Sequence, residues 1–499
     1  MRSWVMFLAA VPAVAATCDS LATLAIPRAT ITTAALVPAG SFAPPAGPAV
    51  SNVPAFCRLA GSIKPSSDSD IQFEVWMPAA GWNGKFQGIG NGGFAGSLSY
   101  GQMGVALRKG YATASTDTGH RGNGTDGSWG TGHPEQVVDF GHRAIHETAV
   151  AAKAAIAAFY GGGPKRSYFN SCSNGGRQAL MEAQRYPQDY DGIIAGAPAN
   201  YWTHLISNSL WVANAMSEPG AHIPPSKLAA IEAAALASCD AKDGVKDGVI
   251  DSPDRCGFKP ASLLCQGAES DACLTKAQVA GLEKILGGIR GSKGQIYPGF
   301  VVGGITGQGG WNDWITGGAP GKSLAYAFGN GFFANIVHQN KDWDYRGFDA
   351  DRDSKKADDE YASILNATSP DLSKFRGRGG KLIVYHGWSD AAITPVNAID
   401  YYKSVKDPAG FVRLFMVPGM QHCGGGPGPN DFGQGSPGAS GDPLRDINTA
   451  LEKWVEEGVA PAQIIAKRAE RTRPLCPYPQ LATYKGTGST DDAGNFVCK

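Results

Sequence analysis

Short apolar runs of strand length alternate with longer segments of helical periodicity along residues 71–200. Apolar residues at helical spacing fill residues 137–159, Gly161 to Pro164 end that pattern, and a second helical pattern covers 177–185. Between these helices lie strand-like runs flanked by glycines, at 73–76, 85–87, 167–170 and 193–195. The alternation predicts βαβ units, and therefore an α/β fold with a mostly parallel sheet.

The pattern changes after about residue 200. Alanine-rich helical segments at 227–237 and 276–286, several cysteines and many glycines replace the alternation. Strand-like runs resume at 381–385 and 411–417. We therefore expect a discontinuous domain with an inserted lid, with the boundaries 17–200 and 371–499 for the domain and 201–370 for the lid.

Composition excludes several classes of protein. The 499 residues include 44 Lys and Arg against 44 Asp and Glu, so the net charge of zero indicates neither nucleic acid nor an anionic membrane surface as a partner. Apolar residues make up 43% of the chain and include 11 Trp, which excludes a disordered protein. The 67 glycines follow no triplet period and indicate many tight turns.

The N-terminus has the three parts of a secretory signal peptide. Arg2 is followed by an apolar run and then by small residues up to Ala16, so we expect residues 1–16 to be cleaved. The apolar run is too short to span a bilayer, which needs about 20 residues. A lipid anchor on Cys18 is disfavoured because Thr17 precedes it. No other segment has the length and apolar character of a membrane helix, and we expect a secreted or periplasmic protein.

The cysteines support this location. Ten cysteines without any C-x-x-C pair indicate disulfides in an exported chain and not a thiolate metal site. Ten cysteines allow about 945 pairings, so their number alone assigns none. Residues 17–60 are rich in Pro and Ala, and we expect them to be loosely structured except where Cys18 and Cys57 hold them.

Ser173 is the candidate nucleophile. It lies between a predicted strand and a predicted helix, and Gly175 follows two positions later, as in the nucleophile elbow of α/β-hydrolases. Ser171 stands where the G-x-S-x-G pattern has its first glycine, so the motif alone is only moderately specific. The alternative is a glycine-rich turn between strand and helix without a catalytic role.

Two further residues complete a possible triad. Asp390 follows the strand that ends near Tyr385, and His422 follows the next strand in a glycine-rich loop. The order Ser, Asp, His at strand ends is that of the α/β-hydrolases. His422 would take the proton of Ser173 and return it to the leaving alcohol, while Asp390 would orient the imidazole and stabilise its charged form.

An oxyanion needs backbone N–H donors. The N–H of Asn174, directly after the nucleophile, is one candidate. The glycine-rich loop 88–96 is expected to supply the second, from Gly92 or Gly93, which the sequence does not separate. As a dinucleotide fingerprint this loop has the wrong glycine spacing and no helix follows it, so a phosphate site is disfavoured.

At this point the sequence resembles a known family. Cys172-Ser173 and His422-Cys423, with Asp390 between them in sequence, are similar to the paired motifs of the tannase and feruloyl esterase family. The resemblance covers nearly the whole mature chain and implies an α/β-hydrolase fold, a secreted serine esterase and no organic cofactor. It includes the segments Trp82 to Phe86, Gly92 to Gly96, Asp117 to His120, Gly175 to Gln178, Asp191 to Pro198 and Pro418 to Cys423.

The resemblance implies a disulfide between Cys172 and Cys423 that holds nucleophile and base together. In the chain-entropy model, closing a loop of about 250 residues adds on the order of 5 kcal/mol. For the remaining cysteines, closeness in the sequence favours the pairs Cys239 with Cys256, Cys265 with Cys273 and Cys476 with Cys498, which leaves Cys18 with Cys57.

The acidic segment 239–251 is a candidate metal site. Its Asp-Gly steps cannot form a regular helix, and carboxylates without sulfur or imidazole suit a hard cation such as Ca²⁺. The spacing is not that of an EF-hand, and solvated Asp-Gly turns are an equal alternative on composition alone. The resemblance implies a structural Ca²⁺ held by the side chains of Asp240, Asp243 and Asp247 and the carbonyls of Val245 and Val249.

The substrates that the resemblance implies are esters of aromatic acids: hydroxycinnamates such as ferulate, gallate, or terephthalate monoesters, including fragments of plant polymers or polyesters. Aromatic side chains near the motifs, or in the lid, are candidates to contact the ring. An acyltransferase or peptidase with the same triad, or a catalytically silent Ca²⁺-stabilised binding module, remain alternatives. The candidate substrate contacts are Phe94, His386, Trp388, Trp311 and Trp314.

Overall fold

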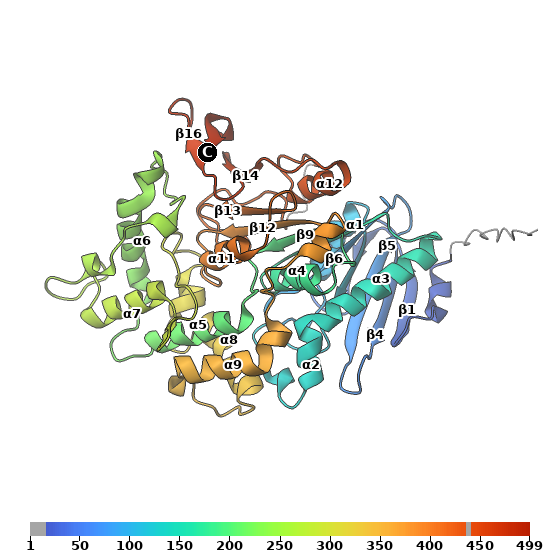
Figure 1. The fold of residues 1–499 in the computed structure, drawn as a ribbon, viewed down its shortest axis with the longest axis horizontal. Coiled ribbons are helices and arrows are strands. Elements are labelled where there is room, and N and C mark those ends of the chain that lie inside the picture. Colours follow the sequence, from blue (N-terminus) through green and yellow to red (C-terminus); the bar gives the residue numbers. More distant parts are fainter. Residues whose placement is uncertain (1–15, 436–440) are drawn as a thin grey trace, which may run out of the picture.

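The structure, a computed structural model, describes residues 16–435 and 441–499. The predicted signal peptide at 1–16 lies outside these ranges except for Ala16. Within the described ranges, a nine-stranded mixed sheet forms the centre of the larger domain (Figure 1). Its strands in spatial order are β1 (Ala29–Val37), β4 (Phe56–Ile63), β5 (Ile71–Pro78), β7 (Ala112–Thr116), β6 (Lys85–Ile89), β8 (Arg166–Cys172), β9 (Gly192–Gly196), β12 (Lys381–Gly387) and β13 (Val412–Val417).

The sheet is parallel over its larger part. All neighbouring strands from β7 through β6, β8, β9 and β12 to β13 run parallel. The strands β1, β4 and β5 extend one edge, where they and β7 pair in antiparallel fashion. The central strand β9 is buried along its whole length, as expected when helices cover both faces of a parallel sheet. The predicted α/β fold with a mostly parallel sheet is confirmed.

Helices pack on both faces of this sheet. The helices α1 and α12 cover one face, and α3, α4 and α11 cover the other. The helical pattern at 137–159 forms α2, a π-helical turn at Asp139–Arg143 and α3, which Gly161 ends in the left-handed conformation with φ 75°. The bounds are α1 (Tyr100–Arg108), α2 (Pro134–Val138), α3 (Ala144–Tyr160), α4 (Asn174–Arg185), α10 (Ser373–Gly377), α11 (Val396–Ser404) and α12 (Ile447–Glu457).

The expectation of a loosely structured segment 17–60 is wrong. This segment forms β1, most of β4 and a hairpin of β2 (Gly40–Phe42) and β3 (Val50–Val53). The strand β1 pairs with β4 along its length, but its side chains are exposed or half-buried. An edge strand that buries few side chains lacks the alternating apolar pattern of a half-buried strand, so its composition resembles that of a loop.

The inserted region is mainly helical and lies at one side of the sheet, at the left and bottom of Figure 1. Its two ends lie side by side, because Ala367 N donates to Asn200 O at 2.8 Å and Thr203 N donates to Asn366 Oδ1 at 3.0 Å. The chain between β9 and β12 therefore leaves the larger domain and returns to it at one place. Its elements are α5 (Trp202–Ala215), α6 (Pro225–Cys239), α7 (Lys276–Gly287), β10 (Arg290–Gly291), β11 (Gly294–Gln295), α8 (Leu324–Phe332) and α9 (Ala350–Leu365).

The C-terminal segment adds two hairpins, β14 (Ile464–Arg468) with β15 (Arg471–Leu475) and β16 (Ala482–Tyr484) with β17 (Phe496–Cys498). Across the described ranges, no helix combines the length and apolar character needed to cross a membrane. All ten cysteines form disulfides, in the pairs that the sequence analysis expected. These pairs are Cys18–Cys57, Cys172–Cys423, Cys239–Cys256, Cys265–Cys273 and Cys476–Cys498.

Candidate active site

Ser173 occupies a sharp turn between β8 and α4. Its backbone has φ 68° and ψ −127°, a conformation that residues other than glycine rarely adopt. Ser173 N donates to Gly196 O at 3.0 Å, and Ser173 O accepts from the N–H groups of Arg177 and Ala199, each at 3.1 Å. These bonds hold the strained turn in place, and the geometry is that of a nucleophile elbow.

Ser171 replaces the usual glycine of the elbow without disturbing it. Its buried side chain lies against two glycines of neighbouring segments. A Cβ atom added to Gly175 would meet Ser171 Oγ at 1.9 Å, and one added to Gly90 would meet it at 2.9 Å. The absence of side chains at these two positions leaves the space that Ser171 fills, so the strand and helix still cross closely.

The structure brings the three predicted triad residues together. His422 Nε2 lies 2.9 Å from Ser173 Oγ, and His422 Nδ1 lies 2.8 Å from Asp390 Oδ2. Both distances are those of hydrogen bonds. The three side chains come from the loops after β8, β12 and β13, which are parallel strands whose carboxyl ends share one edge of the sheet.

Asp390 is buried, and every oxygen of its carboxylate has hydrogen-bond partners. Oδ1 accepts from the N–H groups of Ala392 and Ile393 at 2.8 and 2.9 Å, while Oδ2 faces His422 and also His386, whose Nε2 is 3.2 Å away. Burial alone would raise the pKa of Asp390, but the two imidazoles outweigh it and hold the pKa below its ordinary value. The carboxylate is therefore ionised at neutral pH.

The predicted oxyanion donors border the same space. Gly93 and Asn174 both line the cleft beside Ser173, whereas Gly92 lines only the more open cavity next to it. Among the described residues, the backbone N–H groups of Gly93 and Asn174 have no acceptor. The loop that carries Gly93 is tied to α4, because Asn91 N donates to Gln178 Oε1 at 3.0 Å and Gln178 Nε2 donates to Asn91 Oδ1 at 3.2 Å.

Two residues that the sequence analysis did not single out connect the site to the inserted region. Gln421, directly before His422, donates from Nε2 to Gly304 O at 2.9 Å. The fully buried Arg177 holds Asn174 Oδ1 with Nε at 2.8 Å, and it also donates to Leu365 O at the end of α9. Burial lowers the pKa of Arg177 to about 9. The sequence contained a signal for both residues, because Arg177 and Gln421 lie in the segments Gly175 to Gln178 and Pro418 to Cys423 that resemble the family, but it gave neither residue a role.

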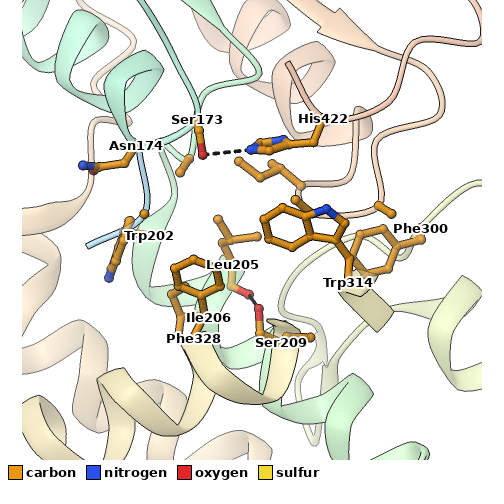
Figure 2. A pocket seen from close by; sticks show the side chains of 16 residues that line it. Ser173, Asn174, Trp202, Leu205, Ile206, Ser209, Phe300, Trp314, Phe328 and His422 are labelled. Carbon is orange, nitrogen blue, oxygen red and sulfur yellow. Dashed lines mark hydrogen bonds between the residues drawn. The ribbon is translucent and has the colours of Figure 1, made fainter. Parts of the chain in front are cut away.

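A mainly apolar cleft opens beside Ser173, between the sheet and the inserted region (Figure 2). About 500 Å³ of empty space, which includes space open to solvent, lies in this cleft. Within the described part of the chain, no Asp, Glu, Lys, Arg or Tyr lines it, and Ser209 Oγ is a hydroxyl at its far side. Its main walls are Trp202, Leu205, Ile206, Phe300, Trp314 and Phe328.

Of the five predicted substrate contacts, only Trp314 lines this cleft. His386 is fully buried behind Asp390, because its position within β12 directs it into the protein. Trp388 is buried away from the cleft, where it lines a different cavity together with residues of the C-terminal segment. Trp311 packs in the core of the inserted region. Phe94 is also fully buried, and it supports the cleft from behind through ring contacts with Trp202 and Phe328 at 5.6 and 5.5 Å.

The acidic segment after α6 forms a tight loop. Asp240 accepts from the N–H groups of Asp247 and Gly248, and Asp247 pairs with Arg473 at 2.6 Å. Burial, together with the neighbouring carboxylates, raises the pKa of Asp251 to about 8. The all-oxygen donor set suits Ca²⁺. However, over residues 16–435 and 441–499 no three His, Cys, Asp or Glu side chains are grouped so as to hold a metal ion.

The mostly parallel sheet with helices on both faces and the serine at a strained turn after β8 define an α/β-hydrolase. Comparison with known proteins specifies the family. The family model for tannase and feruloyl esterase matches residues 57–499. The chain therefore belongs to the tannase and feruloyl esterase family, and it is a carboxylic ester hydrolase.

Individual relatives agree with this assignment. An uncharacterized esterase of Xanthomonas campestris is 45% identical over 97% of this chain and 91% of its own length. The mono(2-hydroxyethyl) terephthalate hydrolase of Piscinibacter sakaiensis is 33% identical over 91% of this chain and 87% of its own. The crystal structure of feruloyl esterase B from Aspergillus oryzae is 33% identical and covers 97% of this chain and 99% of its own, with a TM-score of 0.89.

Proposed function

We propose that the protein is a serine esterase that hydrolyses esters of aromatic acids, with Ser173, His422 and Asp390 as its catalytic triad. The observation that carries this proposal is the hydrogen-bonded chain from Ser173 Oγ through His422 to Asp390, with both distances below 3 Å. Lowering of the Asp390 pKa supports the role assigned to it, because only the ionised carboxylate stabilises a protonated imidazole.

In the proposed reaction Ser173 Oγ attacks the ester carbonyl while His422 Nε2 takes the hydroxyl proton. The oxyanion of the tetrahedral intermediate accepts hydrogen bonds from the N–H groups of Gly93 and Asn174, which have no other acceptor within the described residues. Protonated His422 then gives its proton to the leaving alcohol, and an acyl-enzyme remains. Water, deprotonated by His422, hydrolyses the acyl-enzyme and releases the acid.

The acyl group is proposed to occupy the apolar cleft. The flat walls offered by Trp314 and Phe328, whose stacked rings lie 6.0 Å apart, suit an aromatic acid. A cleft without an ionised side chain disfavours a second carboxylate, because burying an unpaired charge costs several kcal/mol. Ser209 Oγ already donates to Leu205 O, so it can accept a hydrogen bond from one phenol. Among the expected acids, these features favour a hydroxycinnamate such as ferulate over gallate or a terephthalate monoester.

A panel of methyl ferulate, methyl gallate, chlorogenate and mono(2-hydroxyethyl) terephthalate tests this proposal. We expect the largest kcat/KM for the hydroxycinnamates. Ser173→Ala should lower turnover of every ester by at least about 10⁴-fold while the circular dichroism spectrum and melting temperature stay the same. Normal turnover by a pure, folded Ser173→Ala protein would refute the triad, and a preference for the terephthalate ester would refute the assignment of the acid.

Two further properties are part of this proposal. Export from the cytoplasm is supported by the five disulfides, since such bonds persist in oxidising compartments. A structural Ca²⁺ at the loop with Asp240, Asp243 and Asp247 is supported by the concentration of carboxylates there. The backbone carbonyls of Val245 and Val249 would complete its oxygen ligands. This ion would neutralise the carboxylates and take no part in the proton transfers described above.

A further inference from the structure

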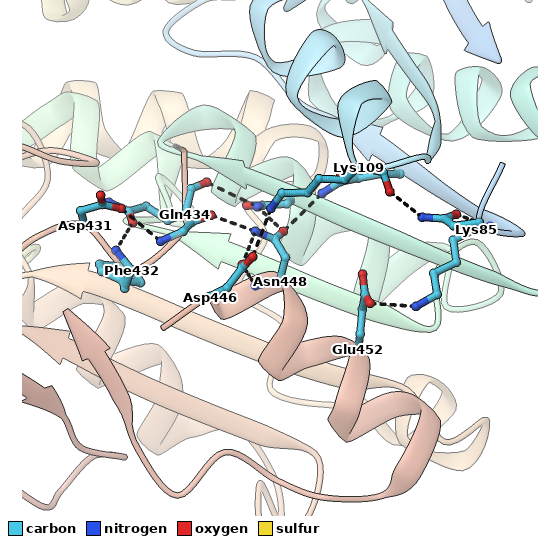
Figure 3. A network of polar contacts seen from close by, with 12 residues as sticks. Lys85, Lys109, Asp431, Phe432, Gln434, Asp446, Asn448 and Glu452 are labelled. Carbon is cyan, nitrogen blue, oxygen red and sulfur yellow. Dashed lines mark hydrogen bonds and ion pairs between the residues drawn. The ribbon is translucent and has the colours of Figure 1, made fainter. Parts of the chain in front are cut away.

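Residues 92–96 form the oxyanion loop, which carries Gly93, and residues 117–124 form a support loop beside it. The oxyanion loop follows β6 and the support loop follows β7, and these strands are parallel neighbours, so their carboxyl ends bring both loops to one edge of the sheet. The strand β6 is fixed by α12, because Lys85 Nζ lies 2.7 Å from Glu452 Oε2 (Figure 3). With the strand fixed, the position of Gly93 depends on the contacts of its loop.

The two loops contact each other directly through their backbones. Phe94 N donates to Gly124 O at 2.8 Å, and Gly96 N donates to Asp117 O at 3.1 Å. This close approach needs glycine, since a Cβ atom added to Gly93 would lie 2.2 Å from Gly124 O. Among the residues that the structure describes, every hydrogen bond from the oxyanion loop to another segment goes to the support loop. The support loop therefore sets the shape of the oxyanion loop.

His120 supplies a side-chain bond between the loops. Its Nε2 lies 2.7 Å from Phe94 O. A carbonyl oxygen can only accept a hydrogen bond, so the hydrogen of the imidazole is on Nε2. Phe94 is fully buried, and within the described ranges its carbonyl has no other donor. Removal of the imidazole would therefore leave this oxygen buried without a partner.

The imidazole of His120 is itself held in place. Its residue is 6% exposed, and the ring stacks on Trp129 with centroids 3.8 Å apart and planes inclined by 12°. Burial lowers the pKa of His120 to about 4, so the ring is neutral at neutral pH. A neutral ring in a fixed orientation donates one hydrogen in one direction. It can therefore fix the peptide group that contains Phe94 O.

This peptide group belongs to the turn that presents Gly93. Ala95 N donates to Gly92 O at 2.9 Å, so Gly93 and Phe94 are the central residues of the turn. Gly93 has φ 55°, a conformation that favours glycine. The support loop holds both the N–H and the carbonyl of Phe94, one on each side of this residue. The turn cannot rotate without breaking one of these bonds, and so the N–H of Gly93 keeps its place at the border of the cleft.

We propose that His120 is a positioning residue for the oxyanion hole, and that its bond to Phe94 O keeps the N–H of Gly93 where the oxyanion forms. The inference rests on the proposed function, since it needs an oxyanion at Ser173. His120 contacts no substrate and acts through Phe94. Because an oxyanion donor acts mainly in the transition state, its displacement should lower kcat and leave KM almost unchanged.

Two variants of His120 separate the hydrogen bond from the packing. His120→Phe keeps an aromatic ring against Trp129 but has no donor, whereas His120→Gln keeps an N–H of similar reach and loses the ring. With the ester of the panel that is turned over fastest, His120→Phe should lower kcat by about 10- to 100-fold, and His120→Gln should restore most of this loss. The matched control is His133→Phe, at a half-exposed histidine of the same region, which should keep both kcat and KM.

Phenylboronic acid gives a second measurement. Its boron bonds to Ser173 Oγ and becomes tetrahedral, so that one oxygen on boron takes the place of the oxyanion. In His120→Phe the inhibition constant of phenylboronic acid should rise by about the factor by which kcat/KM falls. The inhibition constant of ferulate, whose carboxylate is planar, should stay the same. Equal changes of the two inhibition constants would overturn the positioning role.

A measurement on the unaltered protein decides the case if His120→Phe does not fold. In ¹⁵N NMR of histidine-labelled protein at pH 7, the signal that His120→Gln lacks should be that of a neutral imidazole with its hydrogen on Nε2. A hydrogen on Nδ1 would overturn the inference.

The outcomes also separate this inference from the proposed function. Full kcat in His120→Phe, or an equal loss of kcat in His120→Phe and His120→Gln, would remove the role of His120 and leave the triad intact. A protein that hydrolyses no ester of the panel would instead contradict the proposed function.

Discussion

His386 Nε2 lies 3.2 Å from Asp390 Oδ2, the same oxygen that His422 Nδ1 contacts at 2.8 Å. One carboxylate oxygen thus faces two imidazoles. His386 also has Nε2 3.0 Å from Ile393 O, while its buried Nδ1 has no partner within the described part of the chain. Since a buried N–H without an acceptor is costly, we place a hydrogen on Nε2, from which His386 donates to Ile393 O and toward Asp390 Oδ2. Sequence spacing suggested a substrate contact, but the geometry makes His386 a support for the triad.

We expect His386→Leu to lower kcat by about 10- to 100-fold with little change in KM, because Asp390 would lose one of the contacts that orient it and hold its pKa low. His386→Gln keeps an N–H donor of similar reach and should restore part of the loss. Steady-state kinetics on methyl ferulate from pH 5 to pH 9 measures both. A larger effect on KM than on kcat would show instead that His386 acts on substrate binding.

The disulfide Cys172–Cys423 joins segments 251 positions apart, and its cysteines adjoin Ser173 and His422. Replacing both cysteines by Ala should lower the free energy of unfolding by about 2 to 5 kcal/mol, and kcat should fall because nucleophile and base are no longer clamped together. The matched control replaces both Cys265 and Cys273 by Ala, because the disulfide between these two residues joins positions only 8 apart. That control should keep its kcat. Full activity of the Cys172 and Cys423 variant would contradict the coupling.

Asp117 gives a prediction on pH. Burial raises the pKa of Asp117 to about 7. Two hydrogen bonds oppose this rise, because Asp117 Oδ1 accepts from the backbone N–H groups of Gly119 and Gln72, each at 2.9 Å. A carboxyl group whose pKa is higher in the folded state than in the unfolded state contributes its full stability below the unfolded pKa, near 4. This contribution to the free energy of unfolding is lost as the pH rises through the folded pKa, about 7. Over that interval the loss is on the order of 4 kcal/mol.

Asp117→Asn keeps the acceptor oxygen and removes the titration. The melting temperature of the variant relative to the unaltered protein should therefore be higher at pH 8 than at pH 4.5. Comparing the two proteins at each pH cancels the other groups that titrate in this range. An equal difference at both pH values would show that Asp117 is ionised throughout.

The backbone of the site was predictable from the sequence because each part depends on a short pattern. The strand at 167–170, the glycines after Ser173 and the helical pattern at 177–185 together define the elbow. Asp390 and His422 each follow a strand whose apolar run is clear. Because these strands are parallel, their carboxyl ends lie at the same edge of the sheet. The polar residues that follow the strands therefore come together at that edge.

Side-chain contacts were not predictable in the same way, because they depend on which side each residue faces. His386 and Trp388 lie close to Asp390 in sequence, yet one supports the carboxylate and the other packs against a different cavity. In the inserted region Trp314 lines the cleft, whereas Trp311, three positions earlier, is buried in a core. These directions are set by packing between segments far apart in the chain, which no local pattern records.

The last prediction concerns Ca²⁺. If the ion is structural, it stabilises only the folded state and adds RT ln(1 + [L]/Kd), about 2.7 kcal/mol at 100-fold saturation. Chelation with EDTA should then lower the melting temperature, while turnover measured well below that temperature should change little. Asp243→Asn, which removes one charged ligand, should mimic chelation. Asp359→Asn, at an exposed carboxylate of α9, should not. If EDTA stopped turnover at once and left the melting temperature unchanged, the metal would act in the reaction itself, and the assignment of Ser173 as nucleophile would fail.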